Sequence, residues 1–112
     1  MRSIIFYNPD GTIKCEMELT IENTRIAGGM LVRCTMKDST EKVGYIETDD
    51  DNKHIILWTW KNVDEANDAL FGYGNLKNGE ECYKVEISQI EKLEAKLFSN
   101  PRWGCRITNK FE

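Results

Sequence analysis

Residues 13 to 21 alternate strictly between apolar and polar side chains. The apolar positions are Ile13, Cys15, Met17, Leu19 and Ile21. A period of two is typical of a β-strand with one buried face. We therefore predict that these five side chains point into a shared core.

Turn-forming residues place this strand in a hairpin. The motif Asn8-Pro9-Asp10-Gly11 combines a proline, which fixes φ near −65°, with a glycine that is free to adopt positive φ. The sequence thus predicts paired strands over residues 3–7 and 12–21. Similar patterns predict further strands at 30–36, 43–48, 54–60, 83–87 and 103–108. Residues 54–60 are apolar on both phases, which favours a central or interface strand.

Two segments have the signals of short helices. Residues 62–70 begin with a polar cap three positions before a glutamate, carry an apolar face and are followed by Gly72 as a stop signal. Residues 88–97 begin in the same way, with Ile90, Leu93 and Leu97 on one helical face, and Asn100-Pro101 would end that helix.

These elements fit one α+β domain over residues 1–112. We expect a strongly bent antiparallel sheet of about six strands, or a partly closed small barrel, with two short helices packed on it.

The net charge and the length of the apolar segments make some classes of function less favourable than others. The net charge is −4, which disfavours a nucleic-acid binder because phosphate affinity depends on lysine and arginine. The apolar run near the N-terminus is too short for a secretory or membrane-spanning segment, so we expect a cytoplasmic protein that does not contact a membrane. The expected partner is another protein, and the sequence leaves a homo-oligomer open.

Neither a metal site nor a cofactor is expected. No two of the four cysteines form a Cys-x-x-Cys pair, the motif with which many zinc and redox sites begin. Cys15, Cys34 and Cys105 lie on apolar strand phases, where we expect reduced core thiols. The acidic turn at 49–52 lacks the ligand spacing of an EF-hand.

The sequence does not indicate an enzyme. His54 is the only histidine, and it has no evident sequence partner for nucleophilic catalysis. The glycines at 72, 74 and 79 do not match a nucleotide-binding loop.

The strongest candidate binding surface is aromatic. Trp58 and Trp60 share one strand face, and Phe71 and Tyr73 follow at the end of the predicted helix. Tryptophan is enriched at binding hot spots, whereas the structural alternative is that a helix covers both indoles. Acidic residues would rim this surface: Asp49, Asp50 and Asp51. We hypothesise a protein-binding module that inhibits a basic, nucleic-acid-handling enzyme by covering its positive groove.

A second hypothesis from another class is a small barrel that binds nucleic acid or phosphate. Arg102, Arg106 and Lys110 share the polar phase of the predicted last strand, where they would form a basic stripe. The alternative is an ordinary solvated strand face.

About half the chain resembles an Sm-like or SH3-like small barrel. The similar features are a strand from Gly29, the turn at Lys37-Asp38, Gly44-Tyr45-Ile46, an acidic turn and Ile55-Ile56-Leu57, and then residues 83–93 as a strand running into a short helical turn. The resemblance implies barrel topology. The Arg-Gly signature of Sm proteins is absent from residues 83–88, so it does not imply RNA binding.

Overall fold

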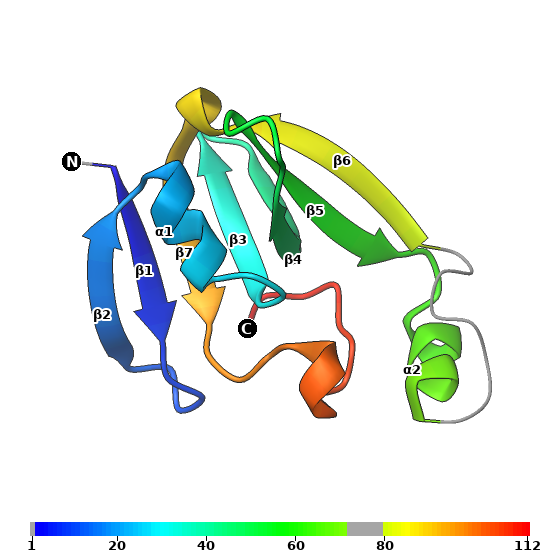
Figure 1. Ribbon diagram of the computed structural model, residues 1–112. Helices are drawn as coiled ribbons and strands as arrows, with labels where there is room; N and C mark the ends of the chain where they lie inside the picture. The colour runs from blue at the N-terminus through cyan, green and yellow to red at the C-terminus, as the bar shows by residue number, and fades with distance from the viewer. Residues whose placement is uncertain (1, 72–79) are drawn as a thin grey trace.

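The computed structural model describes residues 2–71 and 80–112, with seven strands in a single sheet (Figure 1). In chain order the elements are β1 (Ser3–Tyr7), β2 (Ile13–Glu18), α1 (Ile21–Ile26), β3 (Leu31–Met36), β4 (Glu41–Thr48), β5 (His54–Trp60), α2 (Val63–Phe71), β6 (Glu80–Glu86), the 3-10 turn η1 (Ile87–Gln89), β7 (Ile90–Lys96) and the 3-10 turn η2 (Pro101–Trp103). The α+β class is confirmed in its broad form.

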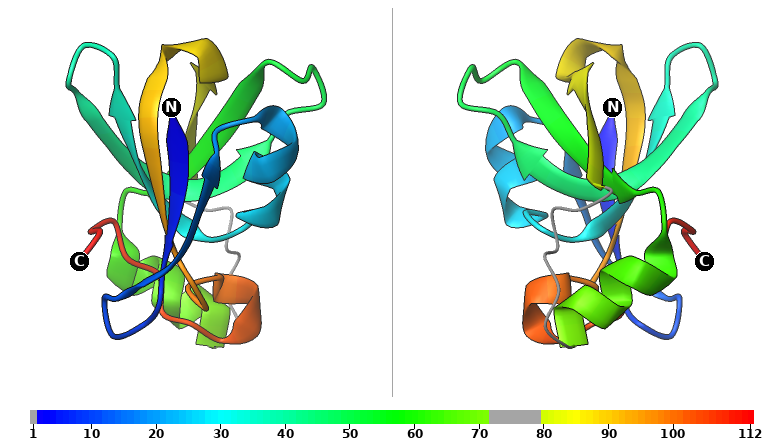
Figure 2. Two further views of the ribbon diagram at one scale, coloured as in Figure 1. Left: turned by 90° about the vertical axis from the view of Figure 1, so that its left-hand side faces the viewer. Right: turned by 90° about the vertical axis from the view of Figure 1, so that its right-hand side faces the viewer.

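The sheet is mixed and open rather than antiparallel and barrel-like. Its strand order is β2-β1-β7-β3-β4-β5-β6. β1 runs parallel to β7, while the other neighbouring pairs are antiparallel. β2 and β6 are the two edges, so the sheet does not close, and the prediction of a partly closed barrel was wrong. The strands fan out across the sheet in both views of Figure 2.

An apolar cluster lies on each face of the sheet. The first cluster includes Ile4, Val32, Leu57 and Leu93, and residues around α1 complete it. The second is smaller and contains Leu31, Tyr45, Trp60, Ala66 and Ile107, which brings α2 and the C-terminal residues onto the other face. Figure 2 shows α1 and the C-terminus on opposite sides of the sheet.

The hairpin is confirmed, but the five-residue core face is not. β2 ends at Glu18, and Ile21 begins α1. Ile13 is 59% exposed, Cys15 is also exposed, and only Leu19 of the set is buried. The register of β1 and β2 shifts at Phe6/Tyr7, so Phe6 pairs with Cys15 but Tyr7 pairs with Ile13.

This register shift is one reason why the alternating pattern of residues 13–21 did not place all five apolar side chains in the core. A bulge at Lys14 leaves that residue without a partner in the strand pairing and places Ile13 opposite a residue of the other sheet face. β2 is also an edge strand, paired only with β1, so its side chains have no second neighbouring strand to cover them. Most of the buried apolar side chains of the first cluster come from the interior strands instead.

The helix predicted over 88–97 is wrong, because these residues form η1 and the interior strand β7. Ile90 and Leu93 are both fully buried in the first cluster although they are three positions apart. In the pairing with β3, Cys34 lies opposite Leu93 while Met36 lies opposite Ile90, which leaves Glu91 as an extra residue. A bulge therefore produced the three-residue spacing that resembles a helix.

The predicted strand over 103–108 is also absent. Residues 101–103 form η2, and the rest of the C-terminal segment, which we define as residues 104–112, has no strand. Side-chain amides hold this segment against α2 and β5. Asn67 of α2 both donates to and accepts from the backbone of Ile107, at 3.0 and 2.7 Å, and Asn109 Nδ2 donates to the Trp60 carbonyl at 2.7 Å. Arg102, Arg106 and Lys110 therefore do not share a strand face, and the basic stripe predicted from their spacing was wrong.

Of the two α-helices among the described residues, one was predicted and one was not. α2 matches the predicted helix, and its cap is confirmed because Asn62 Oδ1 accepts the Glu65 N–H at 3.1 Å. The stop signal Gly72 lies outside the described residues. The unpredicted helix is α1, where Thr20 Oγ1 accepts the Asn23 N–H at 3.1 Å and the Thr24 hydroxyl contacts that of Thr48 at 2.9 Å.

The cysteines are all free thiols, but only Cys34 lies in the core. Burial raises the pKa of the Cys34 thiol to about 12, which keeps it neutral and unreactive. Cys15 is exposed on the edge strand, and Cys105 is partly exposed in the C-terminal segment. The expectation of a core position holds for one of the three cysteines named.

Candidate functional site

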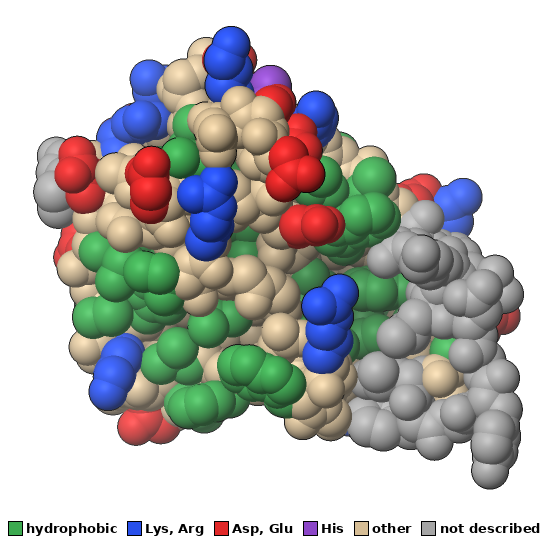
Figure 3. Space-filling model, viewed as in Figure 1, with side chains coloured by type: hydrophobic (Ala, Val, Ile, Leu, Met, Phe, Trp, Pro, Cys, Tyr) green, Lys and Arg blue, Asp and Glu red, His purple; other side chains and the backbone are tan. Residues whose placement is uncertain are grey.

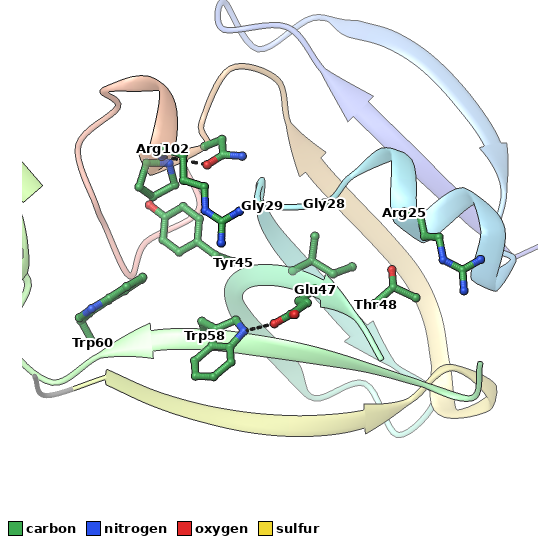
Figure 4. A pocket seen from close by; sticks show the side chains of 12 residues that line it. Arg25, Gly28, Gly29, Tyr45, Glu47, Thr48, Trp58, Trp60 and Arg102 are labelled. Atoms are coloured by element: carbon green, nitrogen blue, oxygen red, sulfur yellow. Dashed lines mark hydrogen bonds between the residues drawn. The ribbon is translucent and has the colours of Figure 1, made fainter. Parts of the chain in front are cut away.

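A groove of about 670 Å³ lies between the α1–β3 connection, β4, β5 and η2. Its walls are formed by Arg25, Gly28, Gly29, Tyr45, Ile46, Glu47, Thr48, Trp58, Trp60, Asn100, Pro101 and Arg102. In Figure 4, Trp60 and Arg25 stand at opposite ends, and Trp58, Tyr45 and Arg102 lie between them. The groove is within the size range of known ligand sites.

The aromatic wall combines two buried rings with one partly exposed ring. Tyr45 and Trp60 are 4% and 7% exposed, and their ring centroids lie 5.5 Å apart at an interplanar angle of 72°. Trp58 is only half-buried, and its indole Nε1–H donates to Glu47 Oε2 at 2.9 Å. This hydrogen bond orients the Trp58 indole, which, unlike the Trp60 indole, is accessible enough to contact a ligand.

The same groove contains two arginines. Arg102 extends from η2 toward Tyr45 and Gly29 (Figure 4), it is exposed, and its guanidinium has no ion pair among residues 2–71 and 80–112. Arg25, at the end of α1, donates from Nη2 to the neutral side chain of Asn52 at 2.7 Å. Neither guanidinium is neutralised by a described carboxylate.

A close backbone contact positions η2. Gly29 has φ of +79°, and a Cβ at this residue would overlap Nδ2 of Asn100, which is itself buried. The other atom of that amide, Oδ1, accepts the Arg102 N–H at 2.9 Å. Gly29 and Asn100 together therefore set where the Arg102 backbone lies beside the groove.

The acidic turn forms a separate cluster. Asp51 Oδ2 and His54 Nδ1 lie 2.5 Å apart, and Lys84 Nζ lies 2.7 Å from Asp49 Oδ2. Backbone N–H donation from Lys53, together with contact with His54, lowers the pKa of Asp51 below its ordinary range. His54 thus has a sequence partner three residues away, contrary to expectation. In Figure 3, acidic side chains gather beside this histidine.

One carboxylate oxygen each from Asp49 and Asp51 and a ring nitrogen of His54 lie within 4.8 Å of one another, close enough to hold a metal ion. The Lys84 ammonium already supplies the positive charge that these carboxylates need, and the hydrogen bond to Asp49 raises the pKa of Lys84. The cluster is explained by its own ion pairs.

The structure brings together only part of the predicted binding surface. Trp58 and Trp60 both line the groove, but Trp60 is buried in its wall. Asp49, Asp50 and Asp51 do not line it. The Phe71 side chain and Tyr73 lie outside the described part of the chain.

Of the alternative phosphate-binding set, Arg102 lines the groove while Arg106 and Lys110 do not. Sequence reasoning missed Arg25, Tyr45, Glu47 and Asn100. The adjacent glycines at 28 and 29 were the one available signal, since they indicate a close backbone approach.

A second, smaller pocket of about 230 Å³ surrounds a buried ionic network on the sheet face. Glu94 is 3% exposed and accepts hydrogen bonds from Arg33 Nε and Nη2, both at 3.0 Å, and from the Tyr7 hydroxyl at 2.9 Å. The Phe111 ring lies 4.8 Å from the Arg33 guanidinium carbon. Every polar group in this network has a partner, which indicates a structural role.

Comparisons of this chain with protein-family models, with curated proteins and with solved structures find no match. Among the residues that the structure describes, no helix has both the length and the apolar character needed to cross a membrane.

Proposed function

We propose that this protein is a non-enzymatic binding module that holds an extended segment of another protein in the groove. The observation that carries the proposal is the half-buried Trp58 indole, which Glu47 holds in place within a groove built from four separate parts of the chain. A ring that is already fixed loses little conformational entropy when it is covered by a partner.

The shape of the groove favours an extended chain. Its lining residues run from Arg25 to Trp60, and bare backbone at the two glycines forms part of the wall (Figure 4). A peptide in extended conformation presents side chains at regular intervals along such a surface. Aromatic walls with a few polar groups are the usual composition of peptide-binding grooves.

The chemistry of the lining residues supports binding rather than catalysis. Neither histidine nor cysteine is among them. Glu47, the one carboxylate in the groove, accepts the Trp58 N–H and so orients the indole. A general base paired with a nucleophile has no evident place here.

The hypothesis that the protein inhibits a basic, nucleic-acid-handling enzyme stays a prediction. The net charge of −4 supports electrostatic attraction to a basic partner. Its proposed acidic rim, Asp49 to Asp51, does not belong to the groove, so that contact would use a different surface.

Single-stranded nucleic acid is the second candidate ligand. Trp58 and Arg102 line the same groove, and a ring beside a guanidinium can stack a base and hold its phosphate. The overall negative charge of the protein disfavours this candidate.

The test is titration with short, extended peptides of acidic, neutral and basic composition, followed by fluorescence anisotropy. Trp58→Ala should weaken binding by roughly 30-fold, as expected for removal of a tryptophan hot spot. Trp103→Ala is the matched control, because Trp103 is 64% exposed and does not line the groove. Absence of binding by every peptide class, or equal losses in both variants, would overturn the proposal.

A further inference from the structure

We propose that the segment held in the groove is acidic, with one carboxylate bound by Arg102, a second near Arg25, and an apolar side chain against Trp58. This inference rests on the proposed function and names the chemistry of its partner. It starts from the two arginines, whose charges the described residues of the groove do not balance.

Arg102 is the primary contact. Its guanidinium extends into the groove without an ion pair among the described residues, while its backbone N–H is held by the buried Asn100 side chain at 2.9 Å. The backbone of Arg102 is thus held in place, while its guanidinium is available to bind a ligand. Arginine in this state matches a carboxylate, which it can bind through two parallel hydrogen bonds.

Arg25 extends the positive charge along the groove. Among the described residues, its guanidinium donates a hydrogen bond to the Asn52 amide oxygen, which carries no charge, and it forms no ion pair. It stands at the end of the groove opposite Trp60 (Figure 4). Cations at separate points along one groove suit an extended chain with more than one acidic residue.

Glu47 does not cancel this preference. It carries one negative charge against the two positive charges of Arg25 and Arg102. Its Oε2 accepts the Trp58 Nε1–H at 2.9 Å, so this oxygen is directed to the indole edge. The ring of Trp58 then offers an apolar surface between the acidic contacts. An acidic partner with apolar residues therefore complements the groove better than a basic or purely polar partner.

A carboxylate peptide also fits better than nucleic acid. Arg25 and Arg102 are the basic residues of the groove, whereas Arg106 and Lys110 do not line it. A phosphate polymer needs several cationic contacts to offset a protein of net charge −4. The same net charge opposes an acidic peptide less strongly, because such a peptide can carry as few as two negative groups, and the groove supplies one arginine for each.

The probe is a short fluorescein-labelled peptide of glutamate, leucine and serine, compared with peptides in which glutamine or lysine replaces each glutamate. At ~50 mM salt, where exposed charges are weakly screened, the acidic peptide should bind roughly tenfold more tightly than the glutamine peptide. The double variant Arg25→Gln/Arg102→Gln should abolish this preference. Arg106→Gln is the matched control, because it removes an exposed arginine outside the groove and should keep the preference.

The outcomes separate this inference from the proposed function. If the acidic and glutamine peptides bind equally and Trp58→Ala still weakens both, the protein binds peptides but the acidic preference is wrong. If no peptide binds, both proposals fail. If single-stranded oligothymidylate binds more tightly than the acidic peptide, and the double variant loses it, the ligand is nucleic acid and the acidic-peptide proposal is wrong.

Discussion

Among the described glycines, Gly29 combines a positive φ with the shortest contact that an added Cβ would make. Its positive φ already disfavours other residues, and the Asn100 side chain occupies the space a Cβ would need. Gly29→Ala should therefore destabilise the protein and shift η2. Gly11→Ala is a matched control, because Gly11 has φ of +88° but no atom lies within 4 Å of the place a Cβ would take.

Chemical denaturation of both glycine variants measures the difference. We expect Gly11→Ala to cost about 1 kcal/mol, the usual strain of a left-handed residue, and Gly29→Ala to cost roughly 2 kcal/mol more. Equal losses in the two variants would mean that the contact with Asn100 does not constrain the fold.

Glu94 is the residue that should make stability depend on acid pH. Burial alone would raise its pKa, but hydrogen bonds from Arg33 and Tyr7 outweigh burial and hold the pKa below its ordinary value. The folded state thus favours the ionised form. The resulting stabilisation is present above about pH 4.3, the ordinary glutamate pKa, and is lost as pH falls through the lower folded pKa.

Glu94→Gln should lower the free energy of unfolding by about 1 to 3 kcal/mol at pH 7, because charged hydrogen bonds to a buried group are lost. The difference from wild type should shrink as the pH falls below about 4. Glu91→Gln, an exposed change on the same strand, is the control. A difference that stays constant from pH 7 to about pH 3 would contradict this account.

At the scale of elements, Asn67 is the residue that attaches the C-terminal segment to α2. Its amide is 4% exposed, donates to the carbonyl oxygens of Val63 and Ile107, and accepts the Ile107 N–H. Asn67→Ala would leave two backbone groups of Ile107 without these partners. We expect a loss of about 2 to 4 kcal/mol and faster hydrogen exchange at the Ile107 amide.

The control for this variant is Asn109→Ala, since Asn109 is exposed although it donates to the Trp60 carbonyl at 2.7 Å. Its cost should be smaller because water can replace the exposed amide. Unchanged exchange protection of Ile107 in Asn67→Ala would show that other contacts hold the segment.

The local spacing of apolar residues predicted most of the strands, but it gave wrong results for β2 and β7, where the register of strand pairing shifts. β3 follows simple alternation, β5 is a continuous apolar run that follows an acidic turn, and α2 has its own cap, so their sequences were sufficient. At β7 a bulge brought Ile90 and Leu93 to the same core and imitated helical spacing. At β2 a bulge turned Ile13 away from the face of Cys15. A bulge depends on the partner strand, which local periodicity does not contain.

At the scale of the whole molecule, the groove could be predicted only in part. Alternation placed Trp58 and Trp60 on one face, and this was confirmed, since both line the groove. Arg25 and Arg102 lie 77 positions apart (102 − 25), and they meet at one groove only because β7 returns the chain through the middle of the sheet. The predicted helix over 88–97 would have removed that strand from the sheet order.

The most direct test of the account is amide and indole NMR of the protein during titration with the acidic peptide. We predict the largest chemical-shift changes at the Trp58 indole N–H and at the amides of Gly28, Gly29 and Arg102, with little change at Tyr7 and Phe111 beside the second pocket. Changes confined to the second pocket or to the acidic turn, with the Trp58 indole unaffected, would contradict the claim that the groove is the binding site.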